Sequence, residues 1–69
     1  MAKAEIENCI RELRKRDGLT QQELADQCGC TRQTIIALEQ GRYVPSLSLA
    51  MRIAGIFGLQ VERVFTLTS

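Results

Sequence analysis

Arg32 and Gln33 are the adjacent residues of this sequence whose side chains are best suited to reading DNA. Arginine pairs bidentately with guanine and glutamine with adenine, and each contact contributes roughly 1–3 kcal/mol of discrimination between bases. Both follow Thr31, whose side chain is typical of a helix N-cap, so they fall in the first turn of a predicted helix, where recognition helices meet base edges. Solvated polar residues at a helix start are the alternative, and these two residues alone do not decide between the interpretations.

A short turn joins this helix to the one before it. Thr20 and Glu23 are spaced as a capping box, which predicts a helix over residues 21–28. Residues 29–31 separate it from the next helix, over residues 32–40. Two short helices joined in this way form a helix-turn-helix unit whose second helix can enter a major groove about 12 Å wide.

The helical period assigns the two faces of the second helix. Inward positions are predicted for Thr31, Ile35 and Leu38. Outward positions are predicted for Arg32, Gln33, Ile36, Ala37 and Gln40. An outward Ile36 allows two interpretations: contact with a thymine methyl group, or packing against the loop at Tyr43 and Val44.

Three cysteines are the other residues with reactive side chains. Cys28 and Cys30 are separated by one residue, which suits neither a relaxed disulfide nor a zinc site, and the chain has no His to complete a ligand set. We expect Cys9, Cys28 and Cys30 to be small buried apolar residues in a reducing compartment, with no metal site. A thiol sensor built on Cys28 and Cys30 is the alternative.

The sequence lacks the usual groups of an enzyme. It has no His, no Gly-rich phosphate loop and no carboxylates clustered on one predicted face. We therefore expect no enzymatic activity, no cofactor and no small-molecule ligand.

Net charge argues only weakly for a polyanionic partner, because nine basic and eight acidic residues leave +1. The distribution of charge is more informative. Between residues 27 and 61 the only acidic residue is Glu39, against three arginines, Arg32, Arg42 and Arg52. One side of the folded molecule can therefore be positive.

Length and composition predict one all-α domain over residues 1–69, with five short helices. The chain is 45% hydrophobic and 25% charged, and its apolar residues recur at helical intervals. Four of its glycines follow amphipathic segments, as left-handed helix terminators do: Gly18, Gly29, Gly41 and Gly58. No stretch approaches the ~20 apolar residues that cross a bilayer and no signal peptide is recognisable, so we expect a cytoplasmic protein without membrane contact.

Apolar spacing predicts the outer helices. Ile6, Cys9, Ile10 and Leu13 form an i, i+3, i+4, i+7 stripe, which predicts a first helix over residues 4–16. Its other face would carry Arg11, Glu12 and Lys15 into solvent.

A fourth helix is predicted over residues 47–57, with Ser46 as its N-cap. Its expected buried face is Leu49, Ile53, Ile56 and Phe57, with Ala50 and Ala54 letting neighbouring helices come close. We expect Gly55, inside this helix, to allow close packing; a weakly placed residue is the alternative. After Gly58, residues 59–65 predict one or two further helical turns.

The tail over residues 61–69 is predicted to mediate dimerisation. Phe65-Thr66-Leu67-Thr68 alternates apolar and polar residues, which favours a short strand. A lone strand has no partner in a helical bundle, so we expect it to pair with the same tail of a second chain; a disordered terminus is the alternative. The expected interface residues are Val61, Val64, Phe65 and Leu67.

Several segments in this order resemble the phage repressor and Cro (XRE-like) class of helix-turn-helix transcriptional regulators. They are Leu19-Thr20-Gln21-Gln22-Glu23-Leu24-Ala25, Gly29-Cys30-Thr31-Arg32-Gln33-Thr34-Ile35, Leu38-Glu39-Gln40-Gly41-Arg42 and Pro45-Ser46-Leu47. The resemblance covers residues 6–65 and is strongest to short single-domain regulators, of which the cytolysin repressor is one. It implies a lambda-repressor-like, five-helix DNA-binding domain.

The resemblance also implies roles for individual residues. Gln21 would bind a phosphate and brace the recognition helix, Arg32 and Gln33 would touch bases, and Arg42 would meet the DNA backbone. Arg14 and Glu39 would form an internal ion pair. The candidate DNA-binding set is completed by Thr31, Thr34, Ile36 and Tyr43.

The function that the resemblance implies is sequence-specific regulation of transcription, as a repressor. A homodimer would bind a palindromic operator in double-stranded DNA, with recognition helices one DNA turn, about 34 Å, apart. The alternative is a protein-interaction module, as in antitoxins or coactivator-like relatives. Gln60 departs from the family's usual Ser or Asp cap, which makes the final helix poorly defined.

Overall fold

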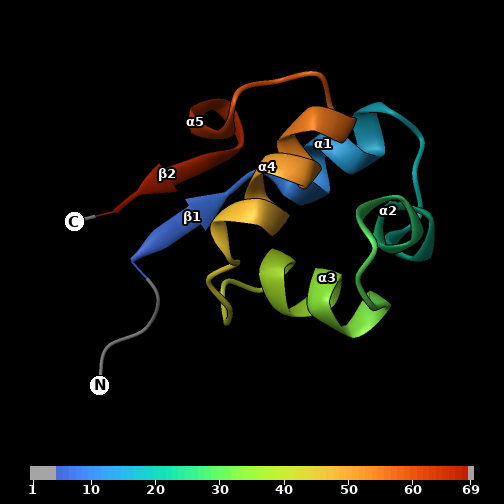
Figure 1. Ribbon diagram of the computed structural model, residues 1–69, viewed down its shortest axis with the longest axis horizontal. Helices are drawn as coiled ribbons and strands as arrows, with labels where there is room; N and C mark the ends of the chain where they lie inside the picture. The colour runs from blue at the N-terminus through green and yellow to red at the C-terminus, as the bar shows by residue number, and fades with distance from the viewer. Residues whose placement is uncertain (1–4, 69) are drawn as a thin grey trace.

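Helices make up most of the computed structural model, which describes residues 5–68 (Figure 1). The elements in chain order are β1 (Ile6–Asn8), α1 (Ile10–Arg16), α2 (Gln21–Cys28), α3 (Arg32–Glu39), α4 (Leu47–Ile56), α5 (Val61–Val64) and β2 (Phe65–Leu67). The predicted five helices are therefore confirmed within this range, with the addition of a small sheet. No helix of residues 5–68 is both long enough and apolar enough to span a membrane.

Three predicted N-caps are formed by side chains. The amide of Glu23 donates to Thr20 Oγ1 at 3.0 Å and the amide of Thr20 donates to Glu23 Oε1 at 2.8 Å, which completes the capping box of α2. Thr31 caps α3 and Ser46 caps α4 in the same manner, each accepting at 3.2 Å from the amide three residues later. At the start of α5, Gln60 makes no such hydrogen bond, and that helix is four residues long.

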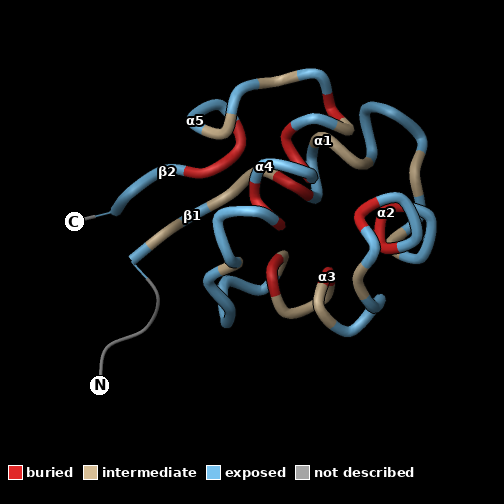
Figure 2. The backbone as a smooth tube through the Cα atoms, in the orientation of Figure 1, coloured by how far each residue is buried: buried red, intermediate tan, exposed pale blue. Residues whose placement is uncertain are grey.

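The core lies between α1, α2, α3 and α4 and is closed by Val64 and Phe65 (Figure 2). The largest fully buried side chains come from five helices: Ile10, Leu24, Cys28, Ile35, Leu38, Ile53 and Val64. On α4 the predicted inward positions are buried except Ile56, which is half-buried. Gly55 faces open space, since a Cβ there would meet no atom within 4 Å, so the expected close packing is wrong.

The first helix begins later than the sequence predicts. Residues 6–8 form β1, which pairs antiparallel with β2 in the register Ile6↔Leu67, Glu7↔Thr66 and Asn8↔Phe65. Asn8 Oδ1 accepts from the amide of Ile10 at 3.1 Å, so helix α1 begins at Ile10. The ladder satisfies main-chain groups that a helix over residues 4–16 would have satisfied internally. Residue 4 itself lies outside the described residues.

The predicted C-terminal strand is present, but its partner is β1 of the same chain. The reason given for pairing with a second chain, that the strand has no partner within its own chain, is therefore wrong. Val64 and Phe65 are only 1% and 8% exposed, because they close the core, so their side chains are not available to another molecule. Val61 is half-buried, and Leu67 is 73% exposed.

Candidate nucleic-acid interface

Helices α2 and α3 are joined by a tight turn at Gly29, which adopts the left-handed conformation (φ +74°). The turn is held by hydrogen bonds from both sides. The amide of Cys30 donates to the carbonyl of Ala25 at 3.1 Å, and Arg52 of α4 donates through Nη1 to the carbonyl of Cys28 at 3.1 Å. The orientation of α3 is thus set by main-chain contacts and by α4.

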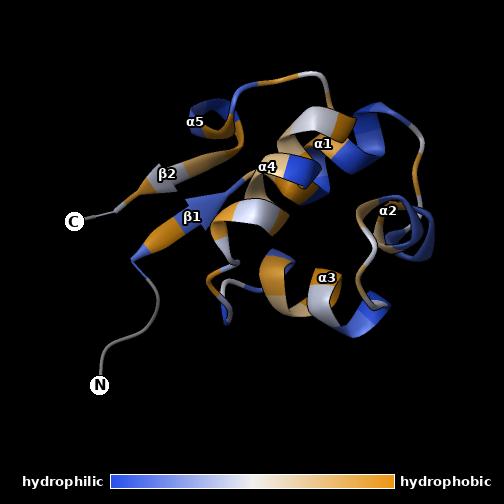
Figure 3. Ribbon diagram, in the orientation of Figure 1, coloured by the Kyte–Doolittle hydropathy of each residue, from blue (hydrophilic) through white to orange (hydrophobic). Residues whose placement is uncertain are grey.

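The predicted faces of α3 are largely confirmed. Ile35 and Leu38 are fully buried, whereas Arg32, Gln33 and Gln40 are exposed and Ile36 and Ala37 half-buried. Hydropathy follows the same division, with a hydrophilic first turn and a more apolar remainder (Figure 3). The first turn of α3 therefore projects polar side chains away from the body of the protein.

Thr31 does not face inward as predicted. It is exposed, and its backbone is extended (φ −91°, ψ 159°), so the helical projection does not apply to it. Its hydroxyl caps α3 and lies 3.1 Å from the hydroxyl of Thr34. Its role is to begin the helix that carries Arg32 and Gln33.

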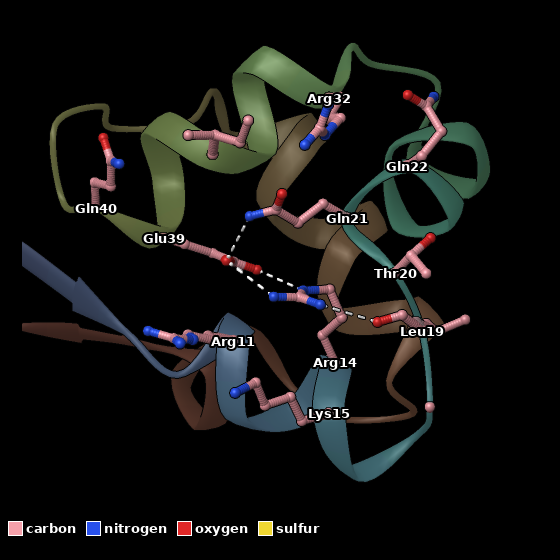
Figure 4. A pocket seen from close by; sticks show the side chains of 12 residues that line it. Arg11, Arg14, Lys15, Leu19, Thr20, Gln21, Gln22, Arg32, Glu39 and Gln40 are labelled. Atoms are coloured by element: carbon pink, nitrogen blue, oxygen red, sulfur yellow. Dashed lines mark hydrogen bonds and ion pairs between the residues drawn. The ribbon is translucent and has the colours of Figure 1, made fainter.

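Glu39, the last residue of α3, is bound by side chains of α1 and α2 (Figure 4). Arg14 donates to it bidentately, from Nε to Oε2 at 2.7 Å and from Nη2 to Oε1 at 3.2 Å. Gln21 adds a bond from Nε2 to Oε1 at 3.2 Å. Arg14 also donates to the carbonyl of Leu19 at 3.0 Å, so this one guanidinium ties together α1, the loop before α2, and α3.

The surroundings of Glu39 favour its ionised form. Burial works to raise the pKa of its carboxyl group, but the hydrogen bonds from Arg14 and Gln21 and the charges of Arg14 and Arg11 outweigh it, so the pKa lies below the ordinary 4.5. The same hydrogen bond raises the pKa of Arg14. Glu39, the acidic residue of α3, is thus neutralised within the fold.

A groove of about 760 Å³ runs between α1, the start of α2 and α3 (Figure 4). We call it the α1–α3 groove. Its lining residues are Arg11, Arg14, Lys15, Gly18, Leu19, Thr20, Gln21, Gln22, Arg32, Ile36, Glu39 and Gln40. Four cationic side chains and one carboxylate among them give the lining a formal charge of +3, against +1 for the whole chain.

The groove brings together some of the predicted DNA-binding residues and leaves out others. Gln21, Arg32 and Ile36 line it, so Ile36 lies on the side of α3 that faces α1 and α2. Arg42 and Tyr43 are exposed in the loop at the opposite end of α3 and do not line it. The candidate set therefore occupies two regions, one at each end of α3.

Sequence reasoning missed three residues near this surface. Arg11 and Lys15 were expected to point into solvent, and their place beside α3 depends on how α1 packs. Asn8 donates from Nδ2 to the carbonyl of Leu38 at 2.9 Å and so connects β1 to α3. A helical stripe in the sequence carries no signal for either contact.

The cysteines are free thiols. Cys28 is buried, and Cys9 and Cys30 are half-buried. Burial raises the pKa of the Cys28 thiol to about 11, and it raises that of Cys30 as well. These shifts keep both thiols protonated at neutral pH.

Comparison with known proteins relates the chain to transcriptional regulators. The helix-turn-helix family matches residues 10–64. An uncharacterized HTH-type transcriptional regulator of Methanothermobacter thermautotrophicus is 63% identical over 59 residues, which is 84% of this chain and 86% of that protein. The uncharacterized HTH-type transcriptional regulator YgzD of Bacillus subtilis is 47% identical over 62 residues, 90% and 94% of the two chains.

Two further proteins that resemble this chain are longer than it. The immunity repressor protein of Bacillus phage phi105 is 38% identical over 55 residues, which is 80% of this chain but 38% of that protein. The crystal structure of the hypothetical transcription factor NHTF from Neisseria superposes with a TM-score of 0.72 at 33% identity, covering 78% of this chain and 62% of the other. The chain belongs to the helix-turn-helix family, as a DNA-binding transcriptional regulator of the phage repressor and Cro (XRE) type.

Proposed function

We propose that this protein is a sequence-specific transcriptional repressor that binds a palindromic operator as a homodimer, with α3 in the major groove. The observation that carries the proposal is the exposed pair Arg32 and Gln33 on the first turn of α3. That turn is capped by Thr31, and Arg52 binds the carbonyl of Cys28 at the end of α2, just before the turn that leads into α3. The similarity to a phage immunity repressor supports repression as the sign of regulation.

In this proposal Arg32 reads a guanine and Gln33 an adenine. Gln21 binds a backbone phosphate through the Nε2 proton that its bond to Glu39 leaves unused, and Thr34 lies near the backbone. Arg42 contacts the backbone at the far end of α3, in the loop that also carries Tyr43. Ile36 contributes an apolar contact from the side of α3 that lines the α1–α3 groove.

The proposed dimer interface is an apolar patch that we define as Tyr43, Val44, Leu47 and Met51. These side chains are 44%, 47%, 72% and 58% exposed, and Leu47 and Met51 lie one turn apart on the same face of α4. Large apolar side chains gathered in this way mark interaction sites. The patch directly follows α3, so a second copy on it would set the spacing of the two recognition helices.

Fluorescence anisotropy with DNA from upstream of the protein's own gene tests base readout. Arg32→Ala and Gln33→Ala are each expected to lower the preference for the operator over random DNA by a factor of about 10, which corresponds to about 1.4 kcal/mol. Arg63→Ala and Gln60→Ala are matched controls, because both residues are exposed beside α5, across the molecule from α3 (Figure 1). If the wild-type protein shows no sequence preference, the protein-interaction module becomes the better interpretation.

Sedimentation velocity tests the interface. Leu47→Lys and Met51→Lys should shift the protein toward monomer, whereas Leu67→Lys, an equally exposed residue of β2, should leave the dimer intact. A dimer that survives both α4 substitutions and is lost with Leu67→Lys would move the interface to the small sheet.

A further inference from the structure

Arg11 and Lys15 are cationic residues of α1 to which neither base readout nor the internal ion pair assigns a role. They are four residues apart, so they lie on one face of the helix, and both line the α1–α3 groove (Figure 4). Like charges at this spacing repel each other and destabilise a helix. Both side chains are exposed, and within residues 5–68 neither forms an ion pair.

Within residues 5–68 no acidic residue near the groove forms an ion pair with these two cations, although the charge of Arg11 helps to lower the pKa of Glu39. Glu39 is already occupied by Arg14 and Gln21. Glu23 accepts from the amide of Thr20 in the capping box of α2, and neither it nor Glu12 lines the groove. The groove is therefore an anion-attracting surface, and the remainder of the chain carries the balancing negative charge.

We propose that Arg11 and Lys15 bind a backbone phosphate of the operator, so that α1 extends the DNA contact beyond the helix-turn-helix unit. The inference rests on the proposed function. Arg32 lines the opposite side of the same groove, and Gln21 lies between them. When α3 enters the major groove, the strand that passes Gln21 continues along α1, where the two cations meet it.

This contact gives the protein affinity without sequence information. A Lys or Arg that neutralises a phosphate releases condensed counterions, which steepens the dependence of log K on log salt by about 0.9 per contact. Arg11 and Lys15 should thus strengthen binding to every DNA sequence by a similar factor, unlike Arg32 and Gln33. The small net charge of the chain conceals this contribution, because the positive charge is confined to one groove.

The test is the salt dependence of binding to operator and to random DNA, measured by anisotropy for the wild type and the double variant Arg11→Ala/Lys15→Ala. We expect the double variant to bind both DNAs more weakly by the same factor and to reduce the salt slope by about 1. Lys15→Arg should keep the slope of the wild type. Arg63→Ala, which removes an exposed arginine from α5, should also leave it unchanged.

The outcomes separate this inference from the proposed function. If the wild type shows no operator preference, the proposed function fails whatever α1 does. If the wild type prefers its operator and the double variant, folded by circular dichroism, keeps the same slope, the phosphate contact on α1 is overturned. The contact is also overturned if inorganic phosphate raises the thermal midpoint of the wild type but not of the double variant, and the two proteins have the same salt slope. That result would favour a free phosphate compound as the ligand.

Discussion

The guanidinium of Arg14 and the carboxylate of Glu39 meet in two hydrogen bonds, of 2.7 and 3.2 Å, that join α1 to the end of α3. The two side chains are 12% and 7% exposed, so the pair is largely withdrawn from solvent. It does two things at once: it fixes the recognition helix against the first helix, and it removes a negative charge from the surface that would face DNA.

Replacing one partner of this pair should lower the free energy of unfolding more than replacing both. Arg14→Met or Glu39→Leu alone leaves a buried charge without its partner, with an expected loss of about 3 kcal/mol in the free energy of unfolding. The double variant should recover much of that loss. Urea unfolding of the four proteins closes the cycle, and a coupling energy near zero would show that the pair contributes no interaction of its own.

Stability should fall in acid partly because of Glu39. Its pKa is lowered on folding, so its contribution is fully present above the unfolded value of about 4.5 and is lost as the pH falls through the lower folded pKa. Asp17, whose pKa is lowered mainly by its hydrogen bond from Arg16, shifts stability in the same direction. Glu39→Gln isolates the contribution of Glu39. The urea midpoint of this variant should depend less on pH than that of the wild type. An equal dependence would exclude Glu39 as a source of the pH dependence.

The same change, Gly to Ala, should have opposite effects at two glycines. Gly29→Ala forces a side chain into the left-handed conformation at φ +74° and should cost about 1 kcal/mol. Gly55→Ala adds a methyl group to open space inside α4 and should stabilise the protein by about 0.5–1 kcal/mol. Thermal unfolding of both variants is the measurement. A destabilising Gly55→Ala would indicate that another molecule packs against this position.

Asn8 should matter more for stability than its place in a short strand suggests. Asn8→Ala removes the bond to the carbonyl of Leu38 and the acceptor for the amide of Ile10, and the expected cost is about 1–2 kcal/mol. Glu7→Ala, at the exposed neighbouring position of β1, should change stability by less than about 0.5 kcal/mol. Similar urea midpoints for the two variants would mean that the Asn8 contacts contribute little.

Cys28 should resist alkylation in the folded protein. Its thiol is buried and its pKa is raised to about 11, so little thiolate is present or accessible at mildly alkaline pH. Iodoacetamide followed by mass spectrometry should label Cys9 and Cys30 before Cys28, and all three residues at equal rates in urea. Rapid labelling of Cys28 without denaturant would instead support the thiol-sensor alternative.

Local signals in the sequence determined most of the helical framework and the family. The caps at Thr20, Thr31 and Ser46 and the period of Ile35 and Leu38 involve residues three or four positions apart, so their geometry follows from the chain itself. The spacing of Arg32 and Gln33 after Thr31 likewise predicted an exposed first turn on α3, which the fold confirms.

Only the tertiary structure decided the pairing of β1 with β2 and the shape of the groove. Ile6 satisfies a helical stripe as well as a strand, and the choice between them depends on its pairing with Leu67, at the opposite end of the sequence. The same pairing places the buried Phe65 opposite Asn8. Arg11 and Lys15 come to line the same groove as Arg32 because α1 packs against α3, and packing between residues so far apart leaves no periodic trace in the sequence.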